Sequence, residues 1–434
     1  MAGTSPPAGV TLAGAVVVCA LSGADLLAIL RRQPSTDLPD LLNVPPPLHK
    51  MLVNARAAAR LLTGHPWVYR GDLVAQPGAL APGSAVVVVD GVGTVLGTGL
   101  YSSQSLLVVR LLSAVEEPLD AAFFRKRLMD ARSLRVRAFG TLPPAWRWVH
   151  AEGDLLGGLV VDVMGDALSI QFNTEGMDAR SSMLVDILGE LSHARTVVLR
   201  KDVAVRSKEG LALGKEVVRG TATPVRFAEG NVFLTVDLLE GQKTGTFLDQ
   251  RDNHVLAGQL AAGQGLDCFS GDGGFALQLA TRCSHVTALD QSAAAVERIQ
   301  RNAADNGFSN ITARAANVFE ALRAMDAAGE TFDTVVVDPP ALAKGKKHVE
   351  AALRGYKELN LRAMKILKPG GLLVTCSCSQ PVDRALFDTM LQDAAVDARR
   401  SLQVLHRRGA GLDHPVKLGF PEGEYLKAVF ATVW

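Results

Sequence analysis

The sequence has few cysteines and no clustered histidines, which excludes two common kinds of stabilisation. Its 434 residues include 5 cysteines and 9 histidines. The cysteines stand at positions 19, 268, 283, 376 and 378, without a Cys-x-x-Cys pair and without histidines at zinc-ligand spacing. This pattern excludes a disulfide framework and a structural zinc site, so we predict no metal and a cytoplasmic protein with free thiols.

An excess of charge of one sign is also absent. Lys and Arg total 45 against 44 Asp and Glu, a formal net charge of +1, so the whole chain has no electrostatic signature of a nucleic-acid partner. The charge is unevenly distributed, because residues 50 to 150 contain 12 basic and 6 acidic residues. Two interpretations of this basic part stay open: an RNA-binding module, or a solvated basic helix over residues 124 to 137.

A clean hydrophobic run of the roughly 20 residues that a membrane-spanning helix needs is missing. The most apolar segment, residues 11 to 30, contains Asp25, is interrupted at Ser22 and Gly23, and has no basic residue before it. Breaker-rich sequence with Pro45-Pro-Pro follows and is typical of a linker. We therefore predict no membrane association, a dispensable extension over residues 1 to 50, and Met51 as an alternative start of translation.

The remaining composition predicts a globular protein of several domains. Hydrophobic residues make up 48% and charged residues 21%, and domains usually have about 100 to 200 residues. Short runs typical of strands, at 85–90, 94–101 and 106–112, predict a small barrel or sheet from residue 51 to about 113. A mixed α+β stretch is predicted from about residue 146 to 226, with strands at 158–162 and 168–172 and a helix near 181–191.

From residue 231 to 434, buried strands alternate with helices, which predicts an α/β domain with a doubly wound parallel sheet. We expect strands at 265–269, 285–290, 332–338 and 371–376, and helices at 275–281, 293–306, 319–328 and 349–367. Because the strands are almost continuous runs of Val and Leu, both faces of this sheet should be covered.

A glycine-rich turn, Phe269-Ser-Gly-Asp-Gly-Gly-Phe275, follows the first of these strands. Gly271 and Gly273 would let backbone N–H groups approach a ligand at the carboxyl edge of the sheet. Asp290 ends the next strand, where a carboxylate can accept both hydroxyls of a ribose. The pair predicts a nucleoside cofactor, either a dinucleotide or S-adenosylmethionine, and the incomplete Gly-x-Gly-x-x-Gly pattern weakens the dinucleotide case.

Two further motifs end neighbouring strands. Asp338-Pro-Pro340 places an acceptor and a rigid bend at the sheet edge, where a planar base could be held, although Asp-Pro is also an ordinary turn. Cys376 and Cys378 should share one face of an extended segment and face the same cleft, the alternative being two buried structural thiols. A thiolate can add to C6 of a pyrimidine, which makes C5 nucleophilic toward an electrophilic methyl group.

A series of ordered motifs over residues 51 to 434 resembles the RlmI-like family of S-adenosylmethionine-dependent large-subunit (23S) ribosomal RNA 5-cytosine methyltransferases. The motifs are Gly64-His-Pro-Trp-Val-Tyr-Arg70, Glu152-Gly-Asp-Leu-Leu-Gly-Gly-Leu-Val-Val-Asp162, Lys243-Thr-Gly-Thr-Phe-Leu-Asp-Gln-Arg-Asp-Asn253, Asp338-Pro-Pro, Cys376-Ser-Cys-Ser379, Asp413-His-Pro415 and Pro421-Glu-Gly-Glu-Tyr-Leu-Lys427. The resemblance implies a PUA domain at 51–122 that binds RNA, a central strand-strand-helix-strand-strand domain at 123–230, and a Rossmann-like methyltransferase domain at 231–434.

The resemblance also implies roles for individual residues. Cys378 would be the nucleophile and Asp338 the acid of the catalytic loop. The expected cofactor-binding residues are Phe269, Gly271, Gly273, Asp290, Asn317, Asp338 and Arg251, the last near the methionine carboxylate, and the expected substrate-binding residues are Pro339, Pro340, Lys243 and Arg70. Asn317 departs from the family, where an acid contacts adenine, and Ala341 stands where many RNA 5-cytosine methyltransferases have a second cysteine.

Two other functions remain open at this stage. One is a methyltransferase acting on N7 or the exocyclic amine of guanine in ribosomal RNA without a covalent cysteine. The other is a non-catalytic RNA-binding or ribosome-assembly factor with an inactive methyltransferase domain. Ribosomal RNA is the expected partner in each case, and the sequence does not distinguish a monomer from a homodimer.

Overall fold

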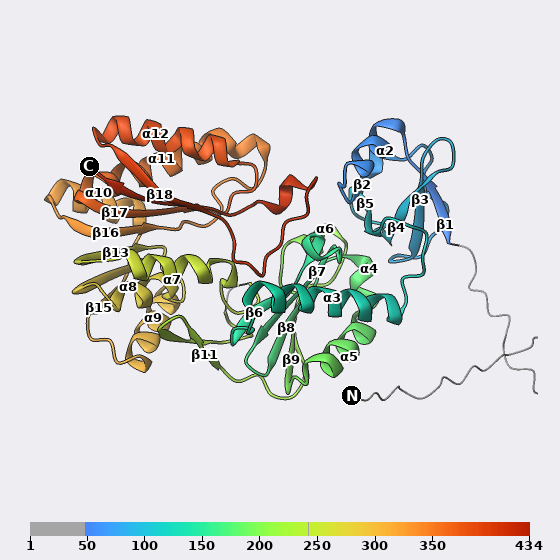
Figure 1. Ribbon diagram of the computed structural model, residues 1–434, viewed down its shortest axis with the longest axis horizontal. Coiled ribbons are helices and arrows are strands. Elements are labelled where there is room, and N and C mark those ends of the chain that lie inside the picture. The colour runs from blue at the N-terminus through green and yellow to red at the C-terminus, as the bar shows by residue number, and fades with distance from the viewer. Residues whose placement is uncertain (1–47, 242) are drawn as a thin grey trace, which may run out of the picture. The chain divides into compact units, whose positions relative to one another are not determined.

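The computed structural model describes residues 48–241 and 243–434. These residues form two five-stranded sheets, one seven-stranded sheet and a two-stranded hairpin (Figure 1). The apolar segment 11–30 and the proline-rich stretch after it lie outside the described residues. Within the described ranges, no helix combines the length and the hydrophobicity that crossing a membrane would require.

The first sheet is built from short, valine-rich strands, as the sequence predicts. It contains β1 (His49–Leu52), β2 (Trp67–Tyr69), β3 (Ala85–Val89), β4 (Val95–Tyr101) and β5 (Leu107–Ser113), in the order β1-β3-β4-β5-β2, together with helix α2 (Ala55–Leu62). β1 pairs in parallel with β3, starting from His49 opposite Val86. A boundary at Met51 therefore falls inside a paired strand.

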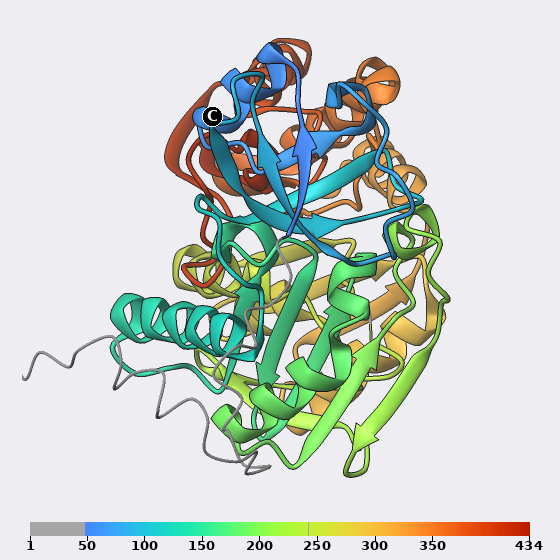
Figure 2. The ribbon, with the colours of Figure 1, turned by 90° about the vertical axis from the view of Figure 1, so that its right-hand side faces the viewer.

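The second sheet has the order β10-β9-β8-β7-β6 (Figure 2). Its elements are α3 (Ala121–Phe139), β6 (Ala145–His150), β7 (Leu159–Met164), β8 (Ala167–Phe172), α4 (Glu175–Asp178), α5 (Ser181–Ser192), β9 (Thr196–Arg200), α6 (Val205–Lys208) and β10 (Lys215–Arg219). Three strands precede α5 and two follow it, one strand more than the resemblance implies, because residues 145–150 pair with β7.

Helix α3 covers the basic segment for which two interpretations were open. The segment is a helix, but it is not uniformly solvated. Arg135 is fully buried and forms a two-pronged ion pair with Asp154, with 2.7 Å between Nη2 and Oδ2. At least one charged side chain of this helix is therefore buried in an ion pair and not solvated.

A hairpin of β11 (Val225–Glu229) and β12 (Val232–Val236) connects the second and third sheets in sequence. Its strands pair from Val225 opposite Val236 to Glu229 opposite Val232. A domain boundary at residue 230 would divide this hairpin at its turn.

The third sheet confirms the α/β fold class expected for the C-terminal part. Its elements are α7 (Arg251–Leu260), β13 (Gln264–Cys268), α8 (Gly274–Ala280), β14 (His285–Asp290), α9 (Ala293–Asp305), β15 (Ile311–Ala315), α10 (Val318–Ala328), β16 (Phe332–Val337), α11 (Val349–Ile366), β17 (Leu367–Ser377), α12 (Arg384–Ala398), β18 (Leu402–Arg408) and β19 (Lys427–Val433). The order is β15-β14-β13-β16-β17-β19-β18. The sheet is mixed rather than wholly parallel, because β19 runs antiparallel to both of its neighbours.

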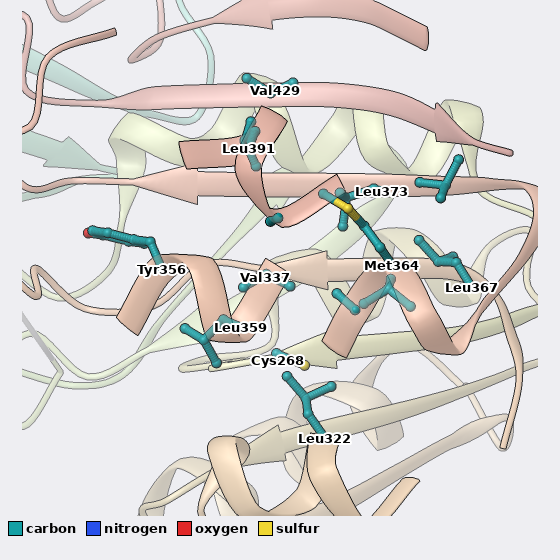
Figure 3. Close-up of a cluster of buried hydrophobic side chains, with 14 of the residues drawn as sticks. Cys268, Leu322, Val337, Tyr356, Leu359, Met364, Leu367, Leu373, Leu391 and Val429 are labelled. Atoms are coloured by element: carbon teal, nitrogen blue, oxygen red, sulfur yellow. The ribbon is translucent and has the colours of Figure 1, made fainter. Parts of the chain in front are cut away.

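Both faces of this sheet are covered by helices, as its continuous apolar strands require. α11 and α12 lie on one side and α7, α8 and α9 on the other (Figure 1). Val335 and Val337 of β16 pack into the cluster with α10, α11 and α12, which Figure 3 shows, whereas Val336 packs with α7 and α8 on the opposite face. The doubly covered sheet brings the ends of β13, β14, β16 and β17 to one edge, where the predicted motifs meet.

Candidate active site

The glycine-rich turn after β13 depends on two glycines that no other residue could replace without strain. Gly273 has φ +90° and ends the turn at the start of α8. A Cβ atom on Gly274 would lie 2.3 Å from the ring of His254 on α7. His254 is itself held by Glu229 on β11, with 2.7 Å between Nδ1 and Oε1. The backbone of the turn is thus packed directly against a buried His–Glu pair.

Asp290, at the end of β14, supports the same turn. Its Oδ2 accepts a hydrogen bond from the N–H of Gly271 at 3.0 Å, and its Oδ1 accepts one from the N–H of Ser292 at 2.9 Å. The carboxylate is partly exposed, and each oxygen keeps a lone pair for a further donor. Asp290 is therefore fixed in orientation and still able to accept ribose hydroxyls.

Asn317 caps helix α10 through its side-chain oxygen. Its Oδ1 accepts the N–H of Phe319 at 3.0 Å, so the amide nitrogen is the group left to face a ligand. Phe319 and Phe269 meet edge to face at 6.4 Å between ring centroids. Phe269, Asn317 and the glycine turn therefore lie around one site.

Asp267, within the apolar strand β13, lies outside the sequence motifs but belongs to the site. It is fully buried; Oδ2 accepts the N–H of Ala276 at 3.0 Å, whereas Oδ1 has no hydrogen-bond partner among the described residues. Burial raises the pKa of Asp267 to about 7. A buried carboxylate oxygen without a donor is costly, so this position favours a ligand that carries an N–H group.

The two cysteines of the β17 motif have different surroundings, which corrects the expectation that both face one cleft. Cys376 lies inside the strand opposite Ala428, is completely buried and packs in the core with Val374 and Phe430. Cys378 lies just beyond the strand end and is partly exposed. Its Sγ is 3.9 Å from the carbonyl oxygen of Pro339. Only Cys378 is therefore accessible to a substrate.

Asp338 belongs to the same loop as Pro339 and is held by the segment before α7. Gln250 donates from Nε2 to Asp338 Oδ2 at 2.9 Å, and Asn253 donates to Gln250 Oε1 at 2.6 Å. Burial raises the pKa of Asp338 to about 6. Burial and the charge of Asp338 raise the pKa of the Cys378 thiol to about 11, while the ammonium of Lys243 acts in the opposite direction.

A polar cluster of Lys243, Asp249 and Tyr425 lies beside Cys378. Lys243 Nζ lies 2.8 Å from Asp249 Oδ2 and 4.4 Å from the centre of the Phe247 ring. The hydroxyl of Tyr425 donates to the same oxygen at 2.7 Å. Although burial would raise the pKa of Asp249, the charge of Lys243 holds it well below its usual range. Asp249 is therefore ionised and fixes Lys243 next to the site.

Lys427, the first residue of β19, is a buried cation with a relative exposure of 2%. Its Nζ donates to the carbonyl oxygens of Ser379 and Tyr425, both at 2.8 Å. Burial lowers the pKa of Lys427 to about 8, and the acidic group that acts most strongly against this shift is Cys378. Lys427 ties the segment after Cys378 to the loop that carries Tyr425.

Two arginines expected at the site form hydrogen bonds within the protein. Arg251 donates from Nη1 to Asp413 Oδ2 and to the carbonyl oxygen of Ala145, both at 3.0 Å. Arg70 donates from Nη2 to the carbonyl oxygens of Ser103 and Ser105 at 2.7 and 3.0 Å. These contacts engage both guanidinium groups with acceptors of the protein, and the roles expected for Arg251 and Arg70 stay predictions.

Several residues of the site belong to the family motifs, although the resemblance assigned them no role. Asp249 and Gln250 belong to the segment from Lys243 to Asn253, and Tyr425 and Lys427 to the segment from Pro421 to Lys427. Two sequence features could have identified some of them: an acid and an amide, Asp249 and Gln250, stand directly before a helix, and Lys427 is a lysine in an apolar strand. Asp267 carried a similar signal, a carboxylate in a strand that is otherwise buried.

The fold and the site together define a methyltransferase domain joined to a PUA-like domain. A model described as "Methyltransferase domain" matches residues 261–408, and a model described as "PUA-like domain" matches residues 51–114. The chain is similar in fold to a putative methyltransferase solved in complex with SAH, with 20% identity and a TM-score of 0.77 over 89% of this chain and 100% of that chain. A putative SAM-dependent methyltransferase from Streptococcus mutans is similar with a TM-score of 0.75, again at 20% identity and the same coverage.

Curated relatives narrow the class to one family. "Ribosomal RNA large subunit methyltransferase I" of Shewanella denitrificans is 37% identical over 381 residues, which cover 85% of this chain and 96% of the relative. The protein of the same name from Erwinia tasmaniensis is 37% identical, with 86% and 96% covered. The chain belongs to this family, the large-subunit ribosomal RNA methyltransferases I. The predicted resemblance is confirmed, as is S-adenosylmethionine as the expected cofactor at the level of the family.

Proposed function

We propose that this protein methylates C5 of a cytosine in large-subunit (23S) ribosomal RNA through a covalent bond between Cys378 and C6 of the base. The proposal is supported by the names of the relatives and by one observation in particular. The accessible thiol of Cys378 lies 3.9 Å from the Pro339 carbonyl, so the nucleophile and the loop that would hold the base meet at one point.

The residues around the glycine turn fit S-adenosylmethionine. Asp290 would accept the ribose hydroxyls, and Phe269, Phe319 and Asn317 would surround the adenine. The unpartnered Oδ1 of Asp267 would accept from the methionine ammonium, because a cation offsets the cost of a buried carboxylate. When bound, the cofactor supplies an electrophilic methyl group.

Cys378 would act as a thiolate. Loss of its proton lets sulfur form a bond to C6 of the flipped-out cytosine, and the C5–C6 electron pair becomes available at C5. C5 would then bond to the methyl carbon, whose bond to the cofactor sulfur breaks and leaves S-adenosylhomocysteine. Loss of the C5 proton and breakage of the C6–S bond then release 5-methylcytidine. Lys243 would stabilise the thiolate, since its charge opposes the raised pKa of this thiol.

Asp338 would hold the polar edge of the cytosine. Because its pKa is raised to about 6, the carboxyl group can carry a proton close to neutral pH and share it with ring nitrogen N3. Protonation at N3 withdraws electrons from C6 and so favours attack by sulfur. Gln250 keeps the carboxyl group oriented through its bond to Oδ2.

The decisive test uses RNA that carries 5-fluorocytosine. Fluorine at C5 blocks the final proton loss, so wild-type protein and S-adenosylmethionine should give a covalent complex that survives denaturation. Cys378→Ala should form no complex and should lose methyl transfer, while keeping its affinity for S-adenosylmethionine. Cys376→Ala is the matched control, and it should retain trapping because the Cys376 thiol is completely buried and cannot reach the substrate.

The alternatives predict other results. A guanine-directed methyltransferase would modify RNA in the Cys378→Ala variant, and nucleoside mass spectrometry of ribosomal RNA from cells with and without the gene would detect a methylguanine. A non-catalytic factor would bind RNA but show no measurable affinity for S-adenosylmethionine in an equilibrium titration.

A further inference from the structure

Three lysines follow the Asp338-Pro-Pro loop closely in the chain and have no part in the proposed chemistry. Lys344, Lys346 and Lys347 stand four to seven residues after Pro340, and all three side chains are exposed. The residues between this loop and helix α11, 341–348, include no acidic residue. Residues 344–347, called the lysine segment below, therefore present three positive charges together on the surface.

The charges of the lysine segment are not neutralised by the protein. Its three lysines form no ion pair with any described residue, and the next acid in the chain, Glu350, pairs with Arg354 at 2.5 Å. The lysines further along α11 and at the start of β17 differ in this respect. Lys357, Lys365 and Lys368 have carboxylate partners at 2.8, 3.9 and 2.8 Å. The lysine segment is thus available to an external anion.

Two contacts hold both sides of the lysine segment beside the nucleophile. Before the segment, the N–H of Ala343 donates to Oγ of Ser379 at 2.9 Å. After it, the hydroxyl of Tyr356 on α11 lies 2.9 Å from the same Oγ. Ser379 is completely buried and follows Cys378 directly in the chain. The segment therefore leaves from, and returns to, the residue next to the accessible thiol.

The length of the segment keeps all three lysines near this anchor. The Cα atom of Lys344 is about 3.8 Å from that of Ala343, and the Cα atom of Lys347 is at most about 14 Å from it. A stacked nucleic-acid strand carries one phosphate per about 3.4 Å. The lysine segment therefore extends over a length of no more than about four nucleotides.

The backbone of a nucleic acid is the ligand that such a segment fits. S-adenosylmethionine has no phosphate group, so three ammonium groups are not needed for the cofactor. An enzyme that takes a base out of its stack must hold the backbone about which the nucleotide rotates. Lysine contacts to phosphate oxygens supply this positioning and do not depend on the base sequence.

We infer that the lysine segment binds the phosphates next to the target cytosine, so that the methyltransferase domain has an RNA-binding surface of its own. This surface would fix the RNA backbone beside Cys378, in addition to any RNA contact made by the PUA-like domain. The inference rests on the proposed function in taking RNA as the substrate.

The test measures how the affinity for RNA depends on salt. Fluorescence anisotropy follows the binding of a short, labelled single-stranded RNA with one central cytosine, without S-adenosylmethionine, at about 50 to 200 mM salt. Each phosphate contact to a single strand adds about 0.7 to the slope of log affinity against log salt. Replacing all three lysines of the segment by Gln in the full-length protein should therefore lower the slope by about 2. At about 0.1 M salt the affinity should fall about 100-fold, because such contacts lose their effect near 1 M.

The matched control replaces Lys357, Lys365 and Lys368 by Gln, which removes the same charge from the same domain. Lys368 stands at the start of β17, whose other end precedes Cys378, so it lies far from the thiol. This control should keep the wild-type slope. Both variants should keep the wild-type melting temperature and affinity for S-adenosylmethionine, which shows that each is folded. The single change Lys346→Gln should lower the slope by about 0.7.

An unchanged slope in the variant of the lysine segment would overturn the inference, as would an equal loss in the control. Binding of polyglutamate that requires the lysine segment, together with RNA binding that does not, would indicate an acidic protein partner and would also overturn it. Trapping on 5-fluorocytosine RNA separates the two proposals. A lowered slope with no trapping by the wild-type protein would refute the proposed function alone, and trapping with an unchanged slope would refute the lysine surface alone.

Discussion

The reactivity of the Cys378 thiol should be controlled by the charge of Asp338. The informative change is Asp338→Asn, which removes the charge while leaving an oxygen that can still accept the hydrogen bond from Gln250. Because the Asp338 carboxylate raises the pKa of the thiol, the variant should have a more acidic Cys378. We expect this variant to be more reactive toward thiol reagents and yet defective in methyl transfer.

The size of the effect follows from the two pKa values. With a pKa of about 11, about one Cys378 side chain in 1000 is a thiolate at pH 8. With a pKa of about 6, Asp338 is almost fully ionised at pH 8 and mostly neutral below pH 5.5. Removing one nearby charge should lower the thiol pKa by about one unit, so the variant should react about tenfold faster at pH 8. The two proteins should approach equal rates as the pH falls through 6.

The assay is the rate of modification of Cys378 by methyl methanethiosulfonate between pH 5.5 and 9, followed by peptide mass spectrometry. Cys268 and Cys376, which are completely buried, serve as internal controls and should stay unmodified while the protein is folded. The reasoning would be refuted by a variant that reacts at the wild-type rate or more slowly at pH 8, or by a rate ratio that does not change with pH.

Three further predictions concern stability. Arg135→Met leaves the buried Asp154 without its cation and should reduce the free energy of unfolding by about 3–5 kcal/mol in urea titrations; a loss below about 1 kcal/mol would contradict a tight ion pair. The pairing with Glu229 raises the pKa of His254 above its usual 6.5, so its contribution to stability is complete below pH 6.5 and is lost as the pH rises through the folded-state pKa. His254→Gln should therefore cost more stability at pH 6 than at pH 9, and an equal cost at both pH values would count against a charged pair. Deleting residues 1–47 should leave the melting temperature within a few degrees of wild type, whereas starting at Met51 should lower it further, because His49 and Lys50 pair with β3; identical melting temperatures would show that this pairing contributes nothing.

Local sequence patterns were sufficient to predict the central strands and helices of the C-terminal domain. The strand at 285–290 and the start of the helix at 293 were predicted at the residues where β14 and α9 begin, because a buried strand and a helix capped by Ser292 are encoded by adjacent residues. The glycine turn, Asp290 and Asp338-Pro-Pro could be placed at one sheet edge for the same reason, since parallel strands align their carboxyl ends.

The surroundings of the site residues depend on contacts between segments that are distant in the sequence. The sequence spacing of Cys376 and Cys378 puts both on one face, and only the antiparallel pairing of β17 with β19 shows that one is enclosed by the core while the other lies beyond the strand end. The contact of Arg251 with Asp413, 162 residues away, could likewise not be predicted from the sequence. Thus the sequence by itself determined the family, the central strands and helices of the C-terminal domain and the motif that contains Cys378, but not β6, β18 or β19. The partner of each buried charge depends on contacts between distant segments, and only the tertiary structure decided those.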